Sequence, residues 1–188
     1  MQEYEFTLTF NVPDPSYTPE SYLDNLAQVG CDDALIGIGQ KGRIALNFTR
    51  EAECALNALY SAIEQVKSVI PDAQLIEAIP DFVGLSDIAD VVGYSRQNIR
   101  KLMLNNQASF PPPIHEGSSA LWHLASVLDW LKEGKGYAID DSLRDLAKAT
   151  MQLNLAKEAF KLDPVINAKF TAVLARVANR PPLVGDAL

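Results

Sequence analysis

The stretch from Leu85 to Leu102 has the spacing that most constrains how this chain can fold. Ala89 is small, as a residue must be where two helices cross closely, and Gly93 can adopt the positive φ of a tight turn. Ile99 and Leu102 follow at the positions where a second helix would pack against the first. A small residue, a glycine and two apolar anchors at this spacing predict a helix-turn-helix.

Serines mark the start of both predicted helices. Ser86 is expected to cap the first helix, with Ile88 and Val92 on its inner side, and Ser95 is expected to cap the second. The side chains that remain outside on the second helix are polar or cationic: Arg96, Gln97, Asn98, Arg100 and Lys101.

These outer side chains match the chemistry of DNA recognition. In a helix-turn-helix, the N-terminal part of the second helix enters the major groove, where Arg reads guanine and Gln or Asn reads adenine. Ser95, with the helix N-terminus, suits a phosphate oxygen. A helical hairpin with a solvated polar face is the alternative. The residues that we predict to bind DNA are Ser95, Arg96, Gln97, Asn98, Arg100 and Lys101.

Further motifs follow the helix-turn-helix: Phe110-Pro111-x-Pro113, Leu121-Trp122 and Val127-Leu128-Asp129-Trp130-Leu131. With them, residues 82–131 resemble the MerR/AlpA-type winged helix-turn-helix regulators of bacteria and phages. The resemblance implies the recognition surface named above and a two-stranded wing with Glu116-Gly117-Ser118-Ser119 at its tip. Family members usually carry an Arg beside the wing Trp, whereas Ala120 and Leu121 precede Trp122 here. The expected wing contacts are His115, Ser118, Ser119 and His123.

The first 80 residues alternate between strand and helix patterns. Apolar residues at every second position predict a half-buried strand: Tyr4, Phe6, Leu8, Phe10 and Val12. Thr18 and Pro19 are expected to start a helix that ends at Gly30. Its expected apolar face holds Tyr22, Leu23, Leu26 and Val29.

Two short strands, 34–39 and 43–48, are predicted next as a hairpin joined near Gln40-Lys41-Gly42. Thr49 is expected to cap a long helix that ends at Pro71, and 74–79 is predicted as a final strand. The apolar positions of that helix are Ala52, Ala55, Leu56, Leu59, Ile63, Val66 and Ile70. The order βαββαβ is the split-βαβ arrangement of ferredoxin-like domains. A less regular pairing around Leu35, Ile36 and Ile38 is the alternative.

Pro80-Asp81 is the expected boundary between domains. We therefore predict an α+β protein with an acidic ferredoxin-like domain at 1–80 and a winged helix-turn-helix domain at 81–135. A helical C-terminal region at 136–180 and a flexible tail at 181–188 follow. Two amphipathic helices, at about 141–161 and 164–179, are expected to form a dimer contact or to complete the core. The first has a stripe seven residues apart: Leu146, Leu153 and Phe160.

The acidic charge is concentrated in the first part of the chain. Residues 1–80 have 4 Lys/Arg and 12 Asp/Glu, whereas 81–135 have 5 and 6 and 136–188 have 7 and 6. In contrast, 94–107 contains three cationic residues and no acidic one. A local cationic stretch in an acidic protein favours a confined nucleic-acid surface.

Other classes of protein are disfavoured. The chain has no run of eighteen apolar residues, so we expect no membrane span. The N-terminus lacks the pattern of a secretory signal. Cys31 and Cys54 form no metal or redox motif, which favours the reducing cytoplasm. His115 and His123 have no cysteine at ligand spacing, so we expect no metal. The chain contains no nucleotide-binding or hydrolase motif, so we expect neither an enzyme nor a cofactor.

The sequence therefore predicts a DNA-binding transcription regulator. We expect it to bind double-stranded DNA as a homodimer, because a single module of this kind makes few base contacts. The acidic domain would face away from DNA, toward a protein partner or a small ligand. The alternative is a protein-interaction module, antitoxin-like or an adaptor, whose acidic domain binds a partner protein and whose helix-turn-helix no longer binds DNA.

Overall fold

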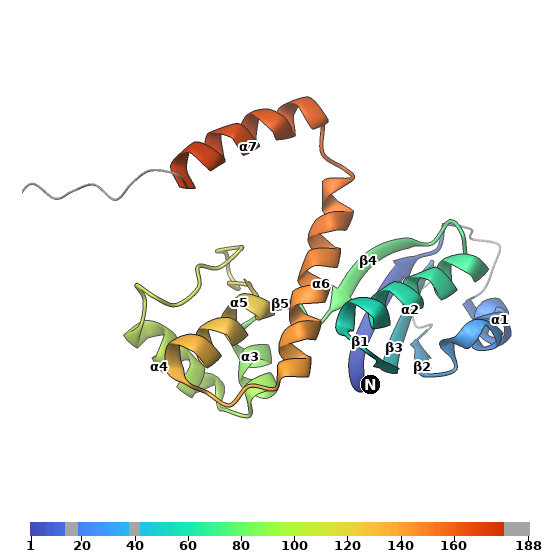
Figure 1. Ribbon diagram of the computed structural model, residues 1–188, viewed down its shortest axis with the longest axis horizontal. Helices are drawn as coiled ribbons and strands as arrows, with labels where there is room; N and C mark the ends of the chain where they lie inside the picture. The colour runs from blue at the N-terminus through green and yellow to red at the C-terminus, as the bar shows by residue number, and fades with distance from the viewer. Residues whose placement is uncertain (14–18, 38–41, 179–188) are drawn as a thin grey trace, which may run out of the picture. The chain divides into compact units, whose positions relative to one another are not determined.

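The computed structural model describes residues 1–13, 19–37 and 42–178 (Figure 1). As the sequence predicts, it is an α+β structure, with a four-stranded antiparallel sheet, a two-stranded sheet and helices. The chain divides into two compact units, Met1–Asn154 and Leu155–Leu188, so the division falls within the long helix α6 (Asp141–Ala159). The tail expected at 181–188 lies outside the described residues.

The four-stranded sheet has the order β2-β3-β1-β4, and all neighbouring strands are antiparallel. Its strands are β1 (Gln2–Asn11), β2 (Ala34–Gly37), β3 (Arg43–Ala52) and β4 (Gln74–Ile79). The alternating pattern expected in β1 is confirmed, because all five of its apolar residues from Tyr4 to Val12 are buried. Phe6 lies opposite Phe48 of β3, and the two rings stack with centroids 5.1 Å apart.

Helical segments pack on the buried face of the sheet. Three short turns replace the single helix expected after Pro19: η1 (Pro19–Tyr22), α1 (Leu23–Leu26) and η2 (Ala27–Cys31). Gly30 ends them with φ of 100°. Leu26 is buried as expected, but Val29 is exposed. Because η2 is wound as a wider π turn, the phase of the helix changes after Leu26 and Val29 faces outward.

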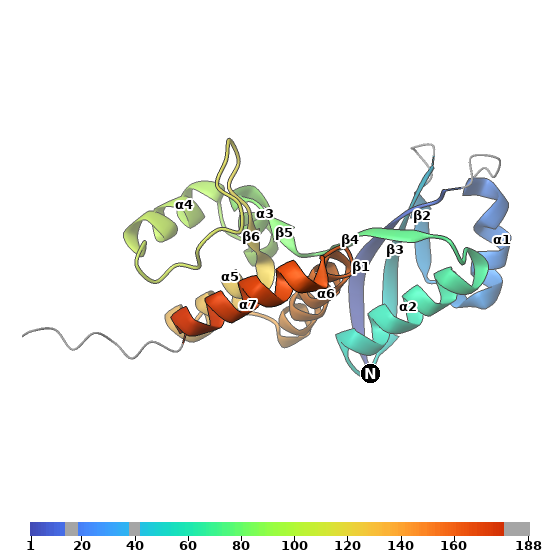
Figure 2. The ribbon, with the colours of Figure 1, turned by 90° about the horizontal axis from the view of Figure 1, so that it is seen from above.

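Helix α2 (Ala55–Val69) lies along the sheet (Figure 2) and starts later than predicted. Thr49 does not cap it, because β3 continues its alternation of buried residues as far as Ala52. The cap comes from far along the chain, since the N–H of Ala55 donates to Oδ2 of Asp145 at 2.8 Å. Leu56, which was expected in the core, is exposed, because the buried face of α2 consists of Ala55, Ala58, Leu59, Ala62 and Val66.

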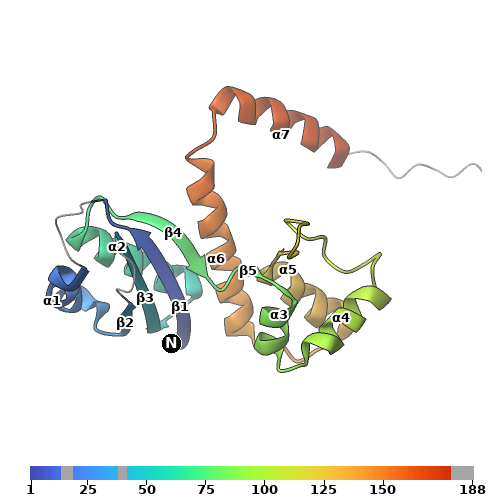
Figure 3. The same ribbon diagram turned by 180° about the vertical axis from the view of Figure 1, so that it is seen from behind.

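The remainder of this unit has a second core. β5 (Phe82–Val83) pairs with β6 (Trp122–His123), and α3 (Leu85–Val92) and α4 (Arg96–Asn105) follow β5 (Figure 3). α5 (Leu124–Asp129) and η3 (Trp130–Gly134) follow β6. The buried members are Val83, Ile88, Ala89, Ile99, Phe110, Trp122, Leu124, Ala125, Val127, Leu128, Leu131 and Ala147.

Helix α6 contributes to both cores. Leu146 is buried in the core of the sheet, and its neighbour Ala147 is buried in the second core. Asn154 is also buried: its Oδ1 accepts from the N–H of Ala78 at 2.9 Å, and its Nδ2 donates to the Ala78 carbonyl at 2.8 Å. The predicted stripe is therefore not one continuous surface, since Leu146 is buried, Leu153 is half-buried and Phe160 is 92% exposed.

Helix α7 (Pro164–Ala178) belongs to the second unit. It begins at the predicted Asp163-Pro164 pair, where Oδ1 of Asp163 accepts from the N–H groups of Val165 and Ile166, each at 2.9 Å. Among the described residues, no helix combines the length and the apolar character that crossing a membrane would require.

Candidate nucleic-acid interface

Helices α3 and α4 are joined by a tight glycine turn. Gly93 has φ of 71° and ends α3, and the N–H of Tyr94 donates to the Ala89 carbonyl at 2.9 Å. Ile88 and Ala89 of α3 and Ile99 of α4 are buried in the same core. Val92 and Leu102, which the spacing also predicts to be inside, are half-buried against this core, and together these residues fix how α4 lies on α3.

The start of α3 differs from the prediction. The helix begins at Leu85, so Ser86 lies within its first turn and does not cap it. The cap position is Gly84, whose N–H donates to Oδ2 of Asp87 at 2.7 Å. A carboxylate at this position reaches back over the first turn and satisfies the free N–H, so no serine cap is needed.

The start of α4 agrees with the prediction, because Oγ of Ser95 accepts from the N–H of Asn98 at 3.2 Å. Arg96, Gln97, Asn98, Arg100 and Lys101 are all exposed, whereas Ile99 between them is buried. No described carboxylate forms an ion pair with any of the three cations on α4, whereas Arg50 and Arg144 each have a carboxylate partner within 3 Å. The charges on α4 are therefore available to an external anion.

The segment expected to form the wing is a loop between α4 and β6 (Figure 2). Two backbone bonds close its base: the N–H of Ile114 donates to the Leu121 carbonyl, and the N–H of Leu121 donates to the His115 carbonyl. His115 and Leu121 form a single bridge where the resemblance implies two strands. Residues 115–119 are all exposed, so the predicted contacts His115, Ser118 and Ser119 face solvent.

Helix α4 and the loop share a cavity of about 410 Å³. Arg96 lines this cavity from α4, and Ser118 and Ser119 line it from the loop. The first turn of α3, from Gly84 to Asp87, forms another wall. The structure therefore brings together a guanidinium and two hydroxyls that lie more than twenty residues apart in the sequence.

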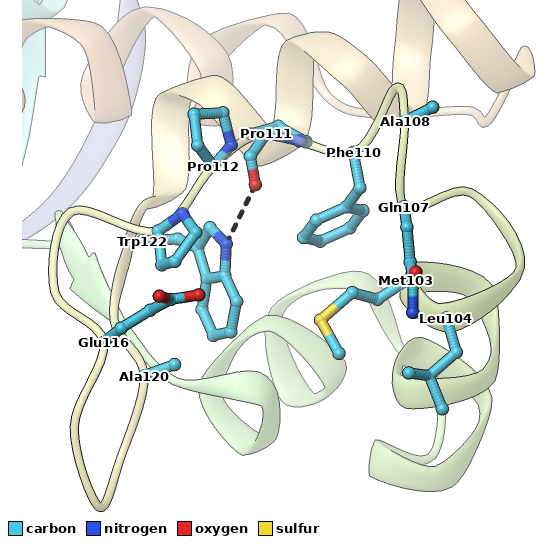
Figure 4. A pocket seen from close by; sticks show the side chains of 11 residues that line it. Met103, Leu104, Gln107, Ala108, Phe110, Pro111, Pro112, Glu116, Ala120 and Trp122 are labelled. Carbon is cyan, nitrogen blue, oxygen red and sulfur yellow. Dashed lines mark hydrogen bonds between the residues drawn. The ribbon is translucent and has the colours of Figure 1, made fainter.

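A buried tryptophan holds the base of this loop in place. Nε1 of Trp122 donates to the Pro111 carbonyl at 3.1 Å (Figure 4). The Phe110 ring lies edge-on to Trp122 and Trp130, with centroids 6.0 and 5.0 Å apart. A separate groove of about 580 Å³ opens beside these rings, and Glu116 lines it together with Met103, Leu104 and the prolines. Glu116 does not line the cavity that contains Arg96.

His123, by contrast, lies outside the wing. It belongs to β6, its Nδ1 is 2.7 Å from Oδ1 of Asp81, and its ring lies 5.4 Å from that of Phe82. The structure therefore places this predicted contact against a buried carboxylate and not in the loop with His115, Ser118 and Ser119. Tyr94, which is not among the predicted contacts, is 45% exposed directly before Ser95. Its position next to the start of α4 is the one sequence signal that could have identified it as part of this surface.

The described residues contain no group of three or more His, Cys, Asp and Glu side chains that could hold a metal ion. Both cysteines are free thiols, and burial raises the pKa of Cys31. No family model, curated protein or solved structure matches the chain. The geometry around α4 therefore carries the functional argument by itself.

Proposed function

We propose that this chain is a transcription regulator that reads double-stranded DNA through α4. The observation that carries the proposal is the row of exposed side chains on the first turns of α4, with cations that have no carboxylate partner among the described residues. Ile99, on the inner side of α4, is buried in the second core, so the exposed side chains belong to a helix that is fixed in position. No catalytic role and no cofactor are part of the proposal, and the regulator would act in the cytoplasm.

Each side chain has a distinct role in the proposed complex. Arg96 and Arg100 are positioned to donate two hydrogen bonds to guanine, and Gln97 and Asn98 to pair with adenine. Lys101 and the hydroxyl of Ser95 bind phosphate oxygens, which fixes the orientation of the helix on the duplex. In the cavity beside Arg96, the hydroxyls of Ser118 and Ser119 are suitable donors for a backbone phosphate next to the loop.

The finer fold assignments belong to the same proposal. The strand order β2-β3-β1-β4 with antiparallel neighbours supports a ferredoxin-like N-terminal domain. The pair α3–α4, the loop closed at His115 and Leu121, and the β5–β6 pair support a winged helix-turn-helix of the MerR/AlpA type. Two copies would read two half-sites about one helical turn apart.

Selection of bound duplexes from a random DNA pool at about 150 mM salt tests the proposal, because affinity for DNA depends steeply on salt. We expect an enriched, roughly two-fold symmetric motif. The Arg96→Ala/Arg100→Ala variant should lose it, at a cost of about 1–3 kcal/mol for each Arg that reads a base. Lys67→Ala/Lys161→Ala removes the same charge from exposed sites elsewhere and should keep the motif. No enrichment with the unaltered chain would contradict the proposal.

A protein partner for the acidic domain is the second candidate function. Two large apolar side chains one turn apart on α2 favour it, because Leu56 and Tyr60 are 65% and 63% exposed. If the selection yields no motif, capture of a partner that Leu56→Ser/Tyr60→Ser no longer binds would support this function.

A further inference from the structure

Helix α7 exposes an apolar face, and such a face is unfavourable in contact with water. The described side chains from 158 to 175 are all exposed. The large apolar ones are more than half exposed: Phe160 92%, Leu162 52%, Val165 62%, Ile166 55%, Phe170 65%, Val173 56% and Leu174 68%. A helix of this length is marginally stable alone, and most helices are stabilised by packing of an apolar face. The exposed face of α7 therefore requires a covering surface.

The spacing on this face suits a second copy of the same helix. Ile166, Phe170 and Val173 are separated by four and three residues, which places them on one seam along α7. A two-fold axis would set this seam against itself, so that each side chain meets the same patch on the other copy. Ala168 and Ala175 lie on the opposite side of the helix, which has no large apolar side chain.

The area of the face is enough for a small dimer contact. At roughly 100 Å² for each of the five large exposed side chains on α7, one copy offers about 500 Å², so two copies would bury about 1,000 Å², the lower limit for a specific interface. Residues 155–178 have four Lys or Arg and two Asp or Glu, and Glu158 is bonded to Lys157 and Lys161 at 2.7 and 2.9 Å. The two cations of α7, Lys169 and Arg176, are not seam positions, so the seam itself is uncharged.

We infer that α7 is the contact through which two copies of this chain associate, with Phe170 and Val173 at its centre. The choice of a second copy as the occupant rests in part on the proposed function, because reading two half-sites requires two recognition helices. The dimer contact therefore lies in the second unit, while Leu146 of α6 serves the core of the first.

Sedimentation velocity of the full chain without DNA tests the inference. Across micromolar concentrations, the unaltered protein should sediment with twice the 20.6 kDa mass of one chain. Phe170→Glu/Val173→Glu should sediment as a single chain, because two carboxylates would be buried in the seam. Ala168→Glu/Ala175→Glu places the same charges on the opposite side and should remain a dimer. A single-chain mass for the unaltered protein, or a dimer that withstands the seam variant, would overturn the inference.

Hydrogen exchange identifies what covers α7 even if the seam variant misfolds. Protection of the α7 amides that rises with protein concentration supports self-association. Protection that is independent of concentration shows that the helix packs on its own chain, and this also overturns the inference. The DNA selection distinguishes the two failures. If single chains bind an enriched motif, the inference about α7 fails and the DNA proposal stands. If the chain is a dimer but enriches no motif, the DNA proposal fails and the inference about α7 stands.

Discussion

Nδ1 of His123 lies 2.7 Å from Oδ1 of Asp81, although the two residues are 42 positions apart. The side chain of Asp81 is fully buried, and its other oxygen accepts from Nδ2 of Asn154 at 2.8 Å. Its backbone carbonyl accepts from the N–H of Leu124 at 2.8 Å. One residue at the expected domain boundary thus connects β6, α5 and α6.

Replacing Asp81 should therefore destabilise the first unit as a whole. Asp81→Ala leaves the half-buried ring of His123 and the buried Asn154 without this partner, which costs about 3 kcal/mol of unfolding free energy. Urea denaturation followed by circular dichroism measures the loss. Asp72→Ala removes an exposed carboxylate at the other end of β4 and should change the stability by less than about 0.5 kcal/mol. Equal effects of the two variants would contradict the assigned role of Asp81.

Gly93 should matter for DNA binding beyond its effect on stability. A Cβ at this position meets no atom within 4 Å, so Gly93→Ala costs only the strain of φ 71°, about 1 kcal/mol. Relief of that strain would shift α4 on α3 and should weaken DNA binding. Gly136 offers a matched control, since it has φ of 69° and the same open surroundings. Gly136→Ala should lose similar stability and bind DNA normally.

The acid stability of the chain should depend on Asp129. Partial burial favours a higher pKa for this carboxyl, but hydrogen bonds from Arg144 and Lys148 outweigh it and lower the pKa. A lowered folded pKa adds stability that is fully present above about pH 4 and is lost as the pH falls through the folded pKa. Asp129→Asn should thus be less stable than the unaltered chain at pH 7. The gap should close below pH 4 in urea titrations, and a gap independent of pH would refute this.

Lys101 and Gln97 should affect DNA binding differently. Lys101→Ala removes a phosphate contact, so affinity should fall about equally for all duplexes and the salt slope should decrease by about one. Gln97→Ala removes a base contact, so preference should relax at one base pair while the salt slope stays unchanged. Binding isotherms at several salt concentrations separate these outcomes. Identical behaviour of the two variants would argue against base reading by α4.

The parts of the fold that the sequence predicts are those controlled by neighbouring residues. Burial of Ala89 and Ile99, the turn at Gly93 and the Ser95 cap depend on contacts within about ten residues, so their spacing is visible in the chain. The alternating strand β1 is visible for the same reason.

The features that the sequence does not predict depend on distant partners. Asp145 caps α2 from 90 residues away, which is why Thr49 was a misleading start for that helix. The Asp81 partner of His123 and the cavity shared by Arg96 and Ser118 have no local pattern either. In each case the partners come from segments that are distant in the sequence and that packing of the cores brings together.

Leu146 and Ala147 are adjacent in α6 yet belong to different cores, which limits how this protein can be divided or recombined. A gene segment that encodes residues 81–135 would include α4 but lack Ala147, and Asp81 would lose Asn154. Transfer of α4 between proteins by recombination would therefore have to include α6, together with a sheet that accepts Leu146. Residues 1–154 form the compact unit that contains both cores.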